Sequence, residues 1–114
     1  MVRDDRSRTE IPPGTLYMLI LTTLARRGPL HGYGIAKHIE QLSDEVLRIE
    51  EGSLYPALQR MLVKGWVTAQ WQRTAGNRRA RFYRLTPAGR KQAGVELSEF
   101  DRVVQAITRV IQPA

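Results

Sequence analysis

Apolar residues recur at helical spacing in two stretches of the first half of the chain. The first begins at Thr15, a favourable N-terminal cap, and ends in two arginines and Gly28. The second begins near His31 or Gly32. The positions predicted to face inward are Leu16, Leu19, Ile20 and Leu24 in the first stretch and Ile35, Ile39 and Leu42 in the second. The outward positions of the second are Lys37, His38 and Glu40. Both stretches predict amphipathic helices.

The residues before and after these stretches lack helical periodicity. Residues 1–14 end in two prolines and a glycine, which predicts a flexible arm. Residues 43–51 form a connector in which Val46, Leu47 and Ile49 can pair briefly as an edge strand.

A third helix is predicted over residues 53–64, where Leu54, Leu58, Met61 and Leu62 form one apolar stripe. With Ser53 as its N-cap, accepting from the Tyr55 N–H, Pro56 falls at the third helical position. A proline is tolerated there, because the backbone N–H at that position has no intrahelical partner to lose. Gly65 is predicted to end the helix.

Residues 66–72 and 79–85 alternate between two sides, which is the pattern of β-strands. In the first strand Trp66, Thr68 and Gln70 fall on one side, and Val67, Ala69 and Trp71 on the other. The intervening residues include Gly76 and Asn77, which favour a loop. Together the two strands predict a β-hairpin with an arginine-loaded tip.

The last helix opens with Thr86 as cap and Pro87 at its first position, where both are favoured. Its apolar residues form a heptad seam: Ala93, Leu97, Phe100, Val104, Ile107 and Ile111. Val103 and Val110 widen this seam beyond what one side of a small domain easily buries. We therefore expect a homodimer through this helix; the alternative is that the stripe packs on its own domain.

This order of elements is that of a winged helix-turn-helix domain. The predicted fold class is mostly α (α+β), with a two-stranded β-wing and a long C-terminal dimerisation helix. We expect a flexible arm over residues 1–14, a DNA-binding domain over 15–86 and the dimerisation helix over 87–114. In this architecture the third helix enters the major groove and the wing lies along the backbone or the minor groove.

Composition narrows the class of protein. The chain is 114 residues long with 42% hydrophobic and 25% charged residues, typical of one globular domain. It has no cysteine, which excludes disulfides and thiolate metal sites and fits a reducing cytoplasm. The longest apolar run is short of a bilayer span, and the N-terminus lacks the apolar core of a signal peptide. We expect a cytoplasmic protein without membrane contact.

The net charge of +7 is unevenly distributed along the chain. Residues 52–95 hold nine basic side chains and no Asp or Glu, while the remaining residues hold nine basic and eleven acidic ones. The formal net charge is therefore +9 for residues 52–95 and −2 for the rest of the chain. A polyanion is the natural partner of such a segment, whereas the alternative is a solvated surface with a chance bias.

Ten residues are candidate contacts with double-stranded DNA. They are Ser53, Tyr55, Pro56, Gln59, Arg60 and Lys64 on the third helix, Arg78 and Arg79 at the wing tip, and His31 and Tyr33 at the start of the second helix. Gln59 and Arg60 are the side-chain types that pair bidentately with adenine and guanine. The alternatives are a Tyr55 packed on the connector, a solvated Gln59 and a core Tyr33. Arg81 and Arg84 are interpreted as strand residues whose stems cover apolar surface.

The remaining chemistry-bearing residues argue against an enzyme. His31 and His38 lie two helical turns apart, about 10 Å, which is too far for one metal ion. No nucleophile or phosphate loop accompanies the carboxylates of the connector, so we expect no catalytic site, metal or cofactor. Trp66 and Trp71 are interpreted as core residues rather than as an effector pocket.

Three segments carry a family resemblance. HGYGIAKHIE (31–40), EGSLYPALQRMLVKGWV (51–67) and RRARFYRLTPAGRK (78–91) resemble the PadR family of bacterial transcriptional regulators, in its short form with one C-terminal helix. The resemblance implies a homodimer on a palindromic operator, usually a repressor, released by a small, often aromatic or hydrophobic effector or by a stress signal. This chain lacks the C-terminal-helix tryptophan of one drug-sensing branch.

Three functions remain open. The first is a sequence-specific, dimeric transcriptional repressor. The second is a winged-helix module that binds proteins without reading DNA, and a general nucleic-acid binder is a third. The acid-free segment favours the first, because a protein-binding wing has no need of so many arginines.

Overall fold

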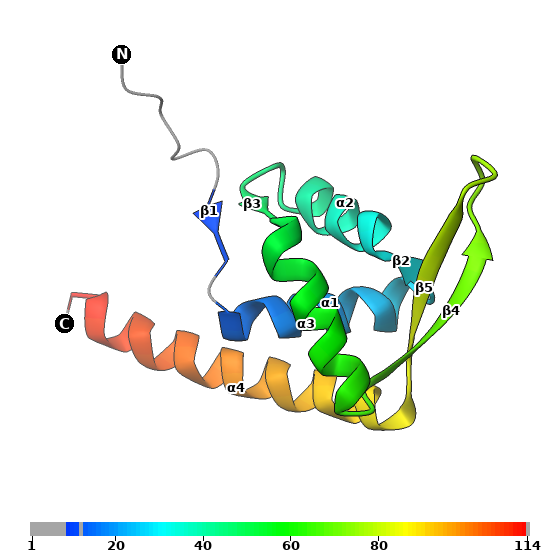
Figure 1. The fold of residues 1–114 in the computed structure, drawn as a ribbon. Coiled ribbons are helices and arrows are strands. Elements are labelled where there is room, and N and C mark those ends of the chain that lie inside the picture. Colours follow the sequence, from blue (N-terminus) through cyan, green and yellow to red (C-terminus); the bar gives the residue numbers. More distant parts are fainter. Residues whose placement is uncertain (1–8, 12, 114) are drawn as a thin grey trace, which may run out of the picture.

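The computed structural model describes residues 9–11 and 13–113, which form four helices and five short strands (Figure 1). The helices are α1 (Pro13–Arg27), α2 (Gly32–Leu42), α3 (Glu51–Val63) and α4 (Pro87–Ile111). The strands are β1 (Thr9–Glu10), β2 (Leu30–His31), β3 (Leu47–Arg48), β4 (Val67–Arg73) and β5 (Arg79–Leu85). The predicted helices and hairpin are thus confirmed, and the fold is a winged helix.

The wing belongs to a three-stranded sheet with the order β2-β5-β4. Strands β4 and β5 pair antiparallel from Val67 opposite Leu85 to Arg73 opposite Arg79. Strand β2 adds Leu30 and His31 to the other edge of β5, a pairing that the predicted two-stranded wing did not include. Because β2 leads directly into α2, this pairing ties the start of α2 to the wing.

The start of α1 differs from the prediction. The helix begins at Pro13, so Thr15 lies inside it and is not its cap. Strand β1 pairs in parallel with β3, Thr9 opposite Leu47 and Glu10 opposite Arg48, which confirms the predicted strand in the connector. The rest of the predicted arm, residues 1–8 and 12, lies outside the described residues.

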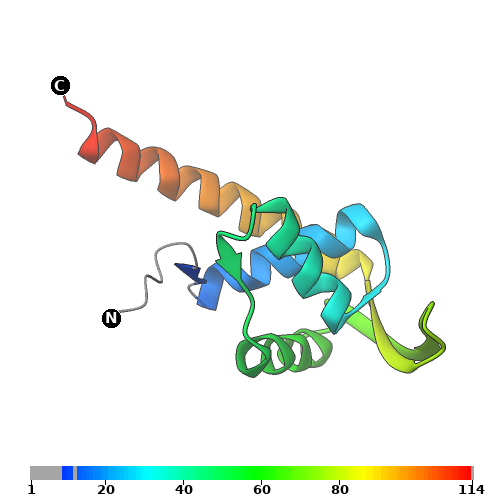
Figure 2. The ribbon, with the colours of Figure 1, turned by 90° about the horizontal axis from the view of Figure 1, so that it is seen from above.

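Helix α1 lies at the centre of the domain, between α2, α3 and α4 (Figures 1 and 2). Ile20, Leu21 and Leu24 of this helix are fully buried. Leu21 is buried although it lies outside the predicted stripe, because a central helix packs on more than one side. Leu42, predicted to face inward, is 68% exposed at the end of α2, beyond the core.

Helix α3 begins earlier than predicted. Its N-cap is Glu50, which makes no side-chain capping bond, so Ser53 is not the cap. Pro56 consequently lies in the second turn of the helix rather than at its third position. Because proline has no backbone N–H, the Gly52 carbonyl lacks the helical hydrogen bond that another residue at position 56 would donate. The end of α3 is as predicted: Gly65 has φ +75°, and the Trp66 N–H donates to the Met61 carbonyl at 3.0 Å, as in a Schellman motif.

The start of α4 is joined to the end of α3. The predicted cap Thr86 accepts from the Gly89 N–H at 3.0 Å, while its hydroxyl donates to the Gly65 carbonyl at 2.6 Å. The Thr86 N–H donates to the Trp66 carbonyl at 3.0 Å. A Cβ on Gly89 would lie 1.9 Å from this same carbonyl oxygen, so only glycine fits. We call this set of contacts the α3–α4 junction.

Beyond this junction α4 runs on past the other elements (Figure 2). Ala93 is only 5% exposed and belongs to the core of its own domain, so it cannot contribute to a seam between chains as predicted. All five later seam positions are exposed: Leu97, Phe100, Val104, Ile107 and Ile111. None of the helices within residues 13–111 is long and apolar enough to cross a membrane.

Candidate DNA interface

Helix α3 separates its buried and exposed residues cleanly. Leu54, Leu58 and Met61 are buried and contribute to the core. The residues proposed for DNA contact on this helix and just after it are all exposed: Ser53, Tyr55, Pro56, Gln59, Arg60 and Lys64. The helix can therefore present polar and basic groups to a groove without giving up core contacts.

Two basic side chains of this face contact aromatic rings. Arg60 Nη1 donates to the hydroxyl of Tyr17, which belongs to α1, at 3.0 Å. The Lys64 ammonium lies 5.2 Å from the centroid of the Trp66 ring, within reach of a cation–π interaction. Trp66 is half-buried and packs on the core, in agreement with its interpretation as a core residue.

Tyr55 packs across the start of α2 rather than on the connector. Its ring lies 2.8 Å from where a Cβ of Gly32 would be, so the absence of a side chain at position 32 makes room for it. Part of the ring is left exposed. Nearby, burial raises the pKa of the Tyr83 hydroxyl; Arg81 opposes this shift and Tyr55 adds to it.

The start of α2 is capped by His31. Its Nδ1 accepts from the Gly34 N–H at 2.9 Å, and its ring packs edge to face on Phe82, with centroids 5.1 Å apart. Only Nε2 is then left to approach a phosphate. Tyr33 is 64% exposed, so the core alternative for this residue is wrong, and the Lys37 ammonium lies 5.8 Å from its ring.

The wing places its arginines around an exposed tryptophan. The register puts Arg73, Arg79 and Arg81 on the same face as Trp71. The Arg79 guanidinium lies 5.1 Å from the centroid of the Trp71 ring. Trp71 is 58% exposed, so its interpretation as a core residue is wrong. The Arg79 guanidinium covers part of the ring, and the rest of it is open to solvent.

The loop at the wing tip is held by its own hydrogen bonds. Arg73 Nη1 donates to both the backbone and the side-chain oxygen of Asn77, each at 3.2 Å. Asn77 has φ 63°, a left-handed conformation that asparagine tolerates well. Arg78 and Arg79 follow directly and are both exposed, as predicted for the tip.

His38 lies away from this surface, on the side of α2 that faces the end of α1. Burial lowers its pKa, and the positive charges of Arg27 and Arg26 lower it further. Arg27 Nη1 is 3.3 Å from His38 Nδ1, so the ring is half-buried beside a cation rather than facing outward as predicted. The residues that the structure describes contain no cluster of His, Cys, Asp or Glu able to hold a metal ion.

Sequence reasoning missed Tyr17 and Lys37 as members of this neighbourhood. Lys37 lies one turn after Tyr33, and that spacing was a usable signal. Tyr17 is distant in sequence from Arg60, so no local pattern links them.

Two curated proteins resemble part of this chain. Over 74 residues, 65% of this chain, it is 46% identical to an uncharacterized 37.1 kDa protein in a transposon of Streptomyces fradiae, and the match spans 19% of that protein. Over 72 residues it is 35% identical to a transcriptional regulator of Mycobacterium tuberculosis, and the match covers 63% of each chain. The matches thus span less than two thirds of either relative.

Solved structures and a family model extend this likeness. A transcriptional regulator from Clostridium thermocellum superposes with a TM-score of 0.78 at 28% identity, covering 87% of this chain and 95% of that one. A PadR family transcriptional regulator from Eggerthella lenta has the same fold, with a TM-score of 0.74 at 24% identity over 89% and 85% of the two chains. The model of the PadR-like transcriptional regulators matches residues 20–95. The chain therefore belongs to the PadR-like family of transcriptional regulators, which are not enzymes.

Proposed function

We propose that this regulator binds a palindromic operator as a homodimer, with α3 in the major groove and the wing along the flanking backbone. The observation that carries the proposal is the continuous run of residues 52–95 without an acidic side chain, which contains both the exposed face of α3 and the arginines of the wing. Base contacts are assigned to Gln59 and Arg60, the two bidentate types on α3.

The other contacts position the protein on the duplex. Ser53, Pro56 and Tyr55 face the groove from the first half of α3, and Lys64 lies at its far end. Arg78 and Arg79 at the wing tip suit phosphates or a narrow minor groove. Tyr33 and the free nitrogen of His31 lie at the start of α2, where helix N–H groups attract phosphate.

The exposed apolar seam of α4 supports the dimer. It consists of Leu97, Phe100, Val104, Ile107 and Ile111, widened by Val103 and Val110. An apolar stripe of this length on a helix that runs past its own domain requires a partner. A second copy of the chain is the simplest one, because a two-fold axis lets the same seam meet itself.

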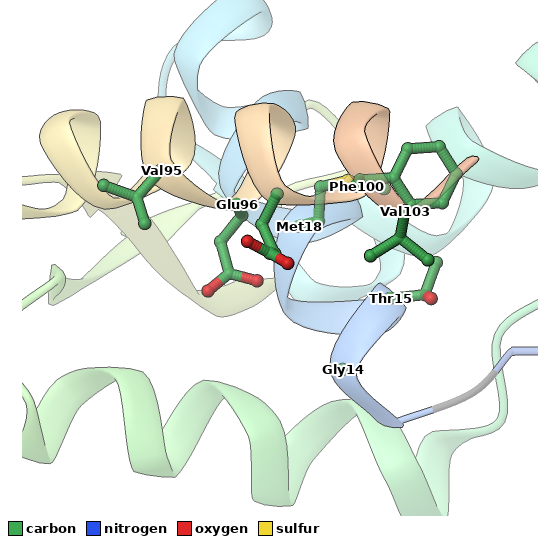
Figure 3. A pocket seen from close by; sticks show the side chains of 8 residues that line it. Gly14, Thr15, Met18, Val95, Glu96, Phe100 and Val103 are labelled. Atoms are coloured by element: carbon green, nitrogen blue, oxygen red, sulfur yellow. The ribbon is translucent and has the colours of Figure 1, made fainter. Parts of the chain in front are cut away.

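A groove beside the seam extends this surface onto α1 (Figure 3). It measures about 410 Å³ and is lined by Gly14, Thr15 and Met18 of α1 and by Val95, Glu96, Glu99, Phe100 and Val103 of α4. Phe100 and Val103 thus belong to both the seam and the groove. We propose that the partner's α4 covers this groove, so α1 joins the dimer interface.

Palindromic DNA follows from the symmetry of such a dimer, because two identical recognition helices related by a two-fold axis meet two inverted half-sites. Repression is the simplest outcome, since a dimer covering both half-sites occupies the promoter DNA by itself. Release by a small aromatic or hydrophobic molecule or by a stress signal completes the proposal and rests on the family resemblance.

The test is binding of the purified protein to the DNA upstream of its own gene and to a scrambled duplex, at several salt concentrations. A preference of about a thousandfold or more would support operator recognition. Equal, salt-steep binding to both duplexes would indicate a general nucleic-acid binder, and absence of binding would favour the protein-interaction module. Sedimentation equilibrium of the same sample reports the proposed dimer.

A further inference from the structure

Tyr17 and Trp66 form an aromatic pair beneath the basic side chains of α3. Their rings meet edge to face, with centroids 6.2 Å apart and planes at 87°. Tyr17 belongs to α1 and Trp66 follows the end of α3, so neither lies on the proposed reading face. Both are half-buried and pack on the hydrophobic core. The core therefore holds both rings in place, and exposed side chains can pack on them.

Each ring holds one basic side chain. The Tyr17 hydroxyl accepts from Arg60 Nη1 at 3.0 Å, and the Trp66 ring lies 5.2 Å from the Lys64 ammonium. Arg60 and Lys64 are one helical turn apart, so they project from the same side of the helix. A phenol is neutral, which means that it fixes the direction of the guanidinium without cancelling its charge.

Packing alone does not fix Arg60. The side chain is exposed and borders a hollow of about 210 Å³ that it shares with Tyr17, Ser53 and Pro56. A long side chain with room to move loses conformational entropy when it binds, whereas one already held in position loses less. The hydrogen bond that Arg60 donates to the Tyr17 hydroxyl is the contact that selects one arrangement.

We propose that Tyr17 is a positioning residue, which presents Arg60 to a base edge and thereby sets sequence preference through a hydroxyl that does not touch DNA. Trp66 supports the Tyr17 ring and directs Lys64 toward the phosphate backbone. This inference rests on the proposed function, because it requires Arg60 to face the duplex.

The test uses Tyr17→Phe, which keeps the ring and removes only the hydroxyl. The DNA is a duplex that the wild-type protein selects from a random pool, together with a scrambled duplex. We expect binding to the selected duplex to weaken about two- to tenfold per half-site, in line with the cost of ordering one long side chain. Binding to the scrambled duplex and the salt slope should not change, because the number of charges facing the DNA is the same.

A double-mutant cycle separates positioning from a structural effect. In an Arg60→Ala background, Tyr17→Phe should have no further effect, since Tyr17 acts only through Arg60. Thr22→Val is the matched control: it removes a hydroxyl from the same helix, one that has no hydrogen-bond partner among the described residues. This variant should bind like the wild type, and circular dichroism melting verifies that each variant is folded.

The outcomes are distinct. If the wild type selects a duplex and Tyr17→Phe binds that duplex as tightly as the wild type does, Tyr17 is not a positioning residue. The same conclusion follows if Tyr17→Phe weakens binding as much in the Arg60→Ala background as in the wild-type background. If the wild type selects no duplex, the proposed operator recognition fails, and this inference fails with it.

Discussion

Replacing Gly89 by alanine tests the α3–α4 junction directly. The added Cβ would lie 1.9 Å from the Trp66 carbonyl oxygen, and a real contact of this kind needs more than 3 Å. The clashing atom belongs to the backbone, so the first turn of α4 must move. Such a movement breaks the two hydrogen bonds from Thr86 to the Gly65 and Trp66 carbonyls.

The size of the effect follows from these contacts. Two hydrogen bonds contribute about 1 to 3 kcal/mol together, and overpacking costs about 1 to 3 kcal/mol more. Removing a glycine from a helix returns at most about 1 kcal/mol. We expect Gly89→Ala to lower the free energy of unfolding by about 1 to 5 kcal/mol, which corresponds to a fall in Tm of at least about 4 °C.

Gly94→Ala provides the matched control on the same helix. No atom lies within 4 Å of a Cβ at this position, so the substitution adds helix propensity without a clash. Thermal unfolding at fixed protein concentration, followed by circular dichroism, should show Gly94→Ala slightly more stable than the wild type and Gly89→Ala much less stable. A Gly89→Ala variant that melts at the wild-type temperature would refute the described junction.

Three further predictions concern the wing, the seam and His38. Replacing Arg78 and Arg79 by alanine should weaken binding to all duplexes and lower the salt slope by about one unit per lost phosphate contact, as titrations at several salt concentrations would show; an unchanged slope would remove both from the interface. Phe100→Asp should yield monomers in sedimentation equilibrium with much weaker operator binding, because the two half-sites are no longer linked, whereas intact dimers would move the interface elsewhere. Because the pKa of His38 is lowered in the fold, the unfolded state binds more protons, and stability should fall as pH drops below the ordinary value of 6.5. Denaturant melts should show a weaker pH dependence for His38→Gln; an identical dependence would exclude the His38 contribution.

Periodicity and turn chemistry predicted most of the fold. The Thr86 cap, the Gly65 stop and the bounds of the wing follow from residues that interact with near neighbours, so a local pattern contains the information. The early start of α3 has no such local signal: its N-cap Glu50 makes no side-chain capping bond, and residues 51 and 52 are exposed, so no apolar position marks them as helical.

Burial of single residues was predicted less well, since it depends on where the domain ends. Leu42 and Trp71 are the last positions of apolar patterns that begin inside the core. Each of them lies where its helix or strand has already left the core, and each is exposed. In the candidate site, too, local features could be predicted from the sequence and contacts between distant elements could not. The exposed face of α3 is visible in its sequence, whereas the contact between Tyr17 and Arg60 joins two helices and required the structure.

The extension of α4 past its domain has a consequence for how operators can diverge. From Ala93 to Ile111 the helix advances by about 27 Å at 1.5 Å per residue, and its start is joined to α3 at the α3–α4 junction. In the proposed dimer, adding one heptad to α4 would keep the seam facing its partner. It would also lengthen the helix by about 10 Å, roughly three base pairs of DNA. Adding a single residue would instead rotate the seam away by about 100°. The exposed part of α4 therefore keeps its seam facing the partner only when its length changes by whole heptads. The spacing between operator half-sites in descendants of this regulator should accordingly change in steps rather than continuously.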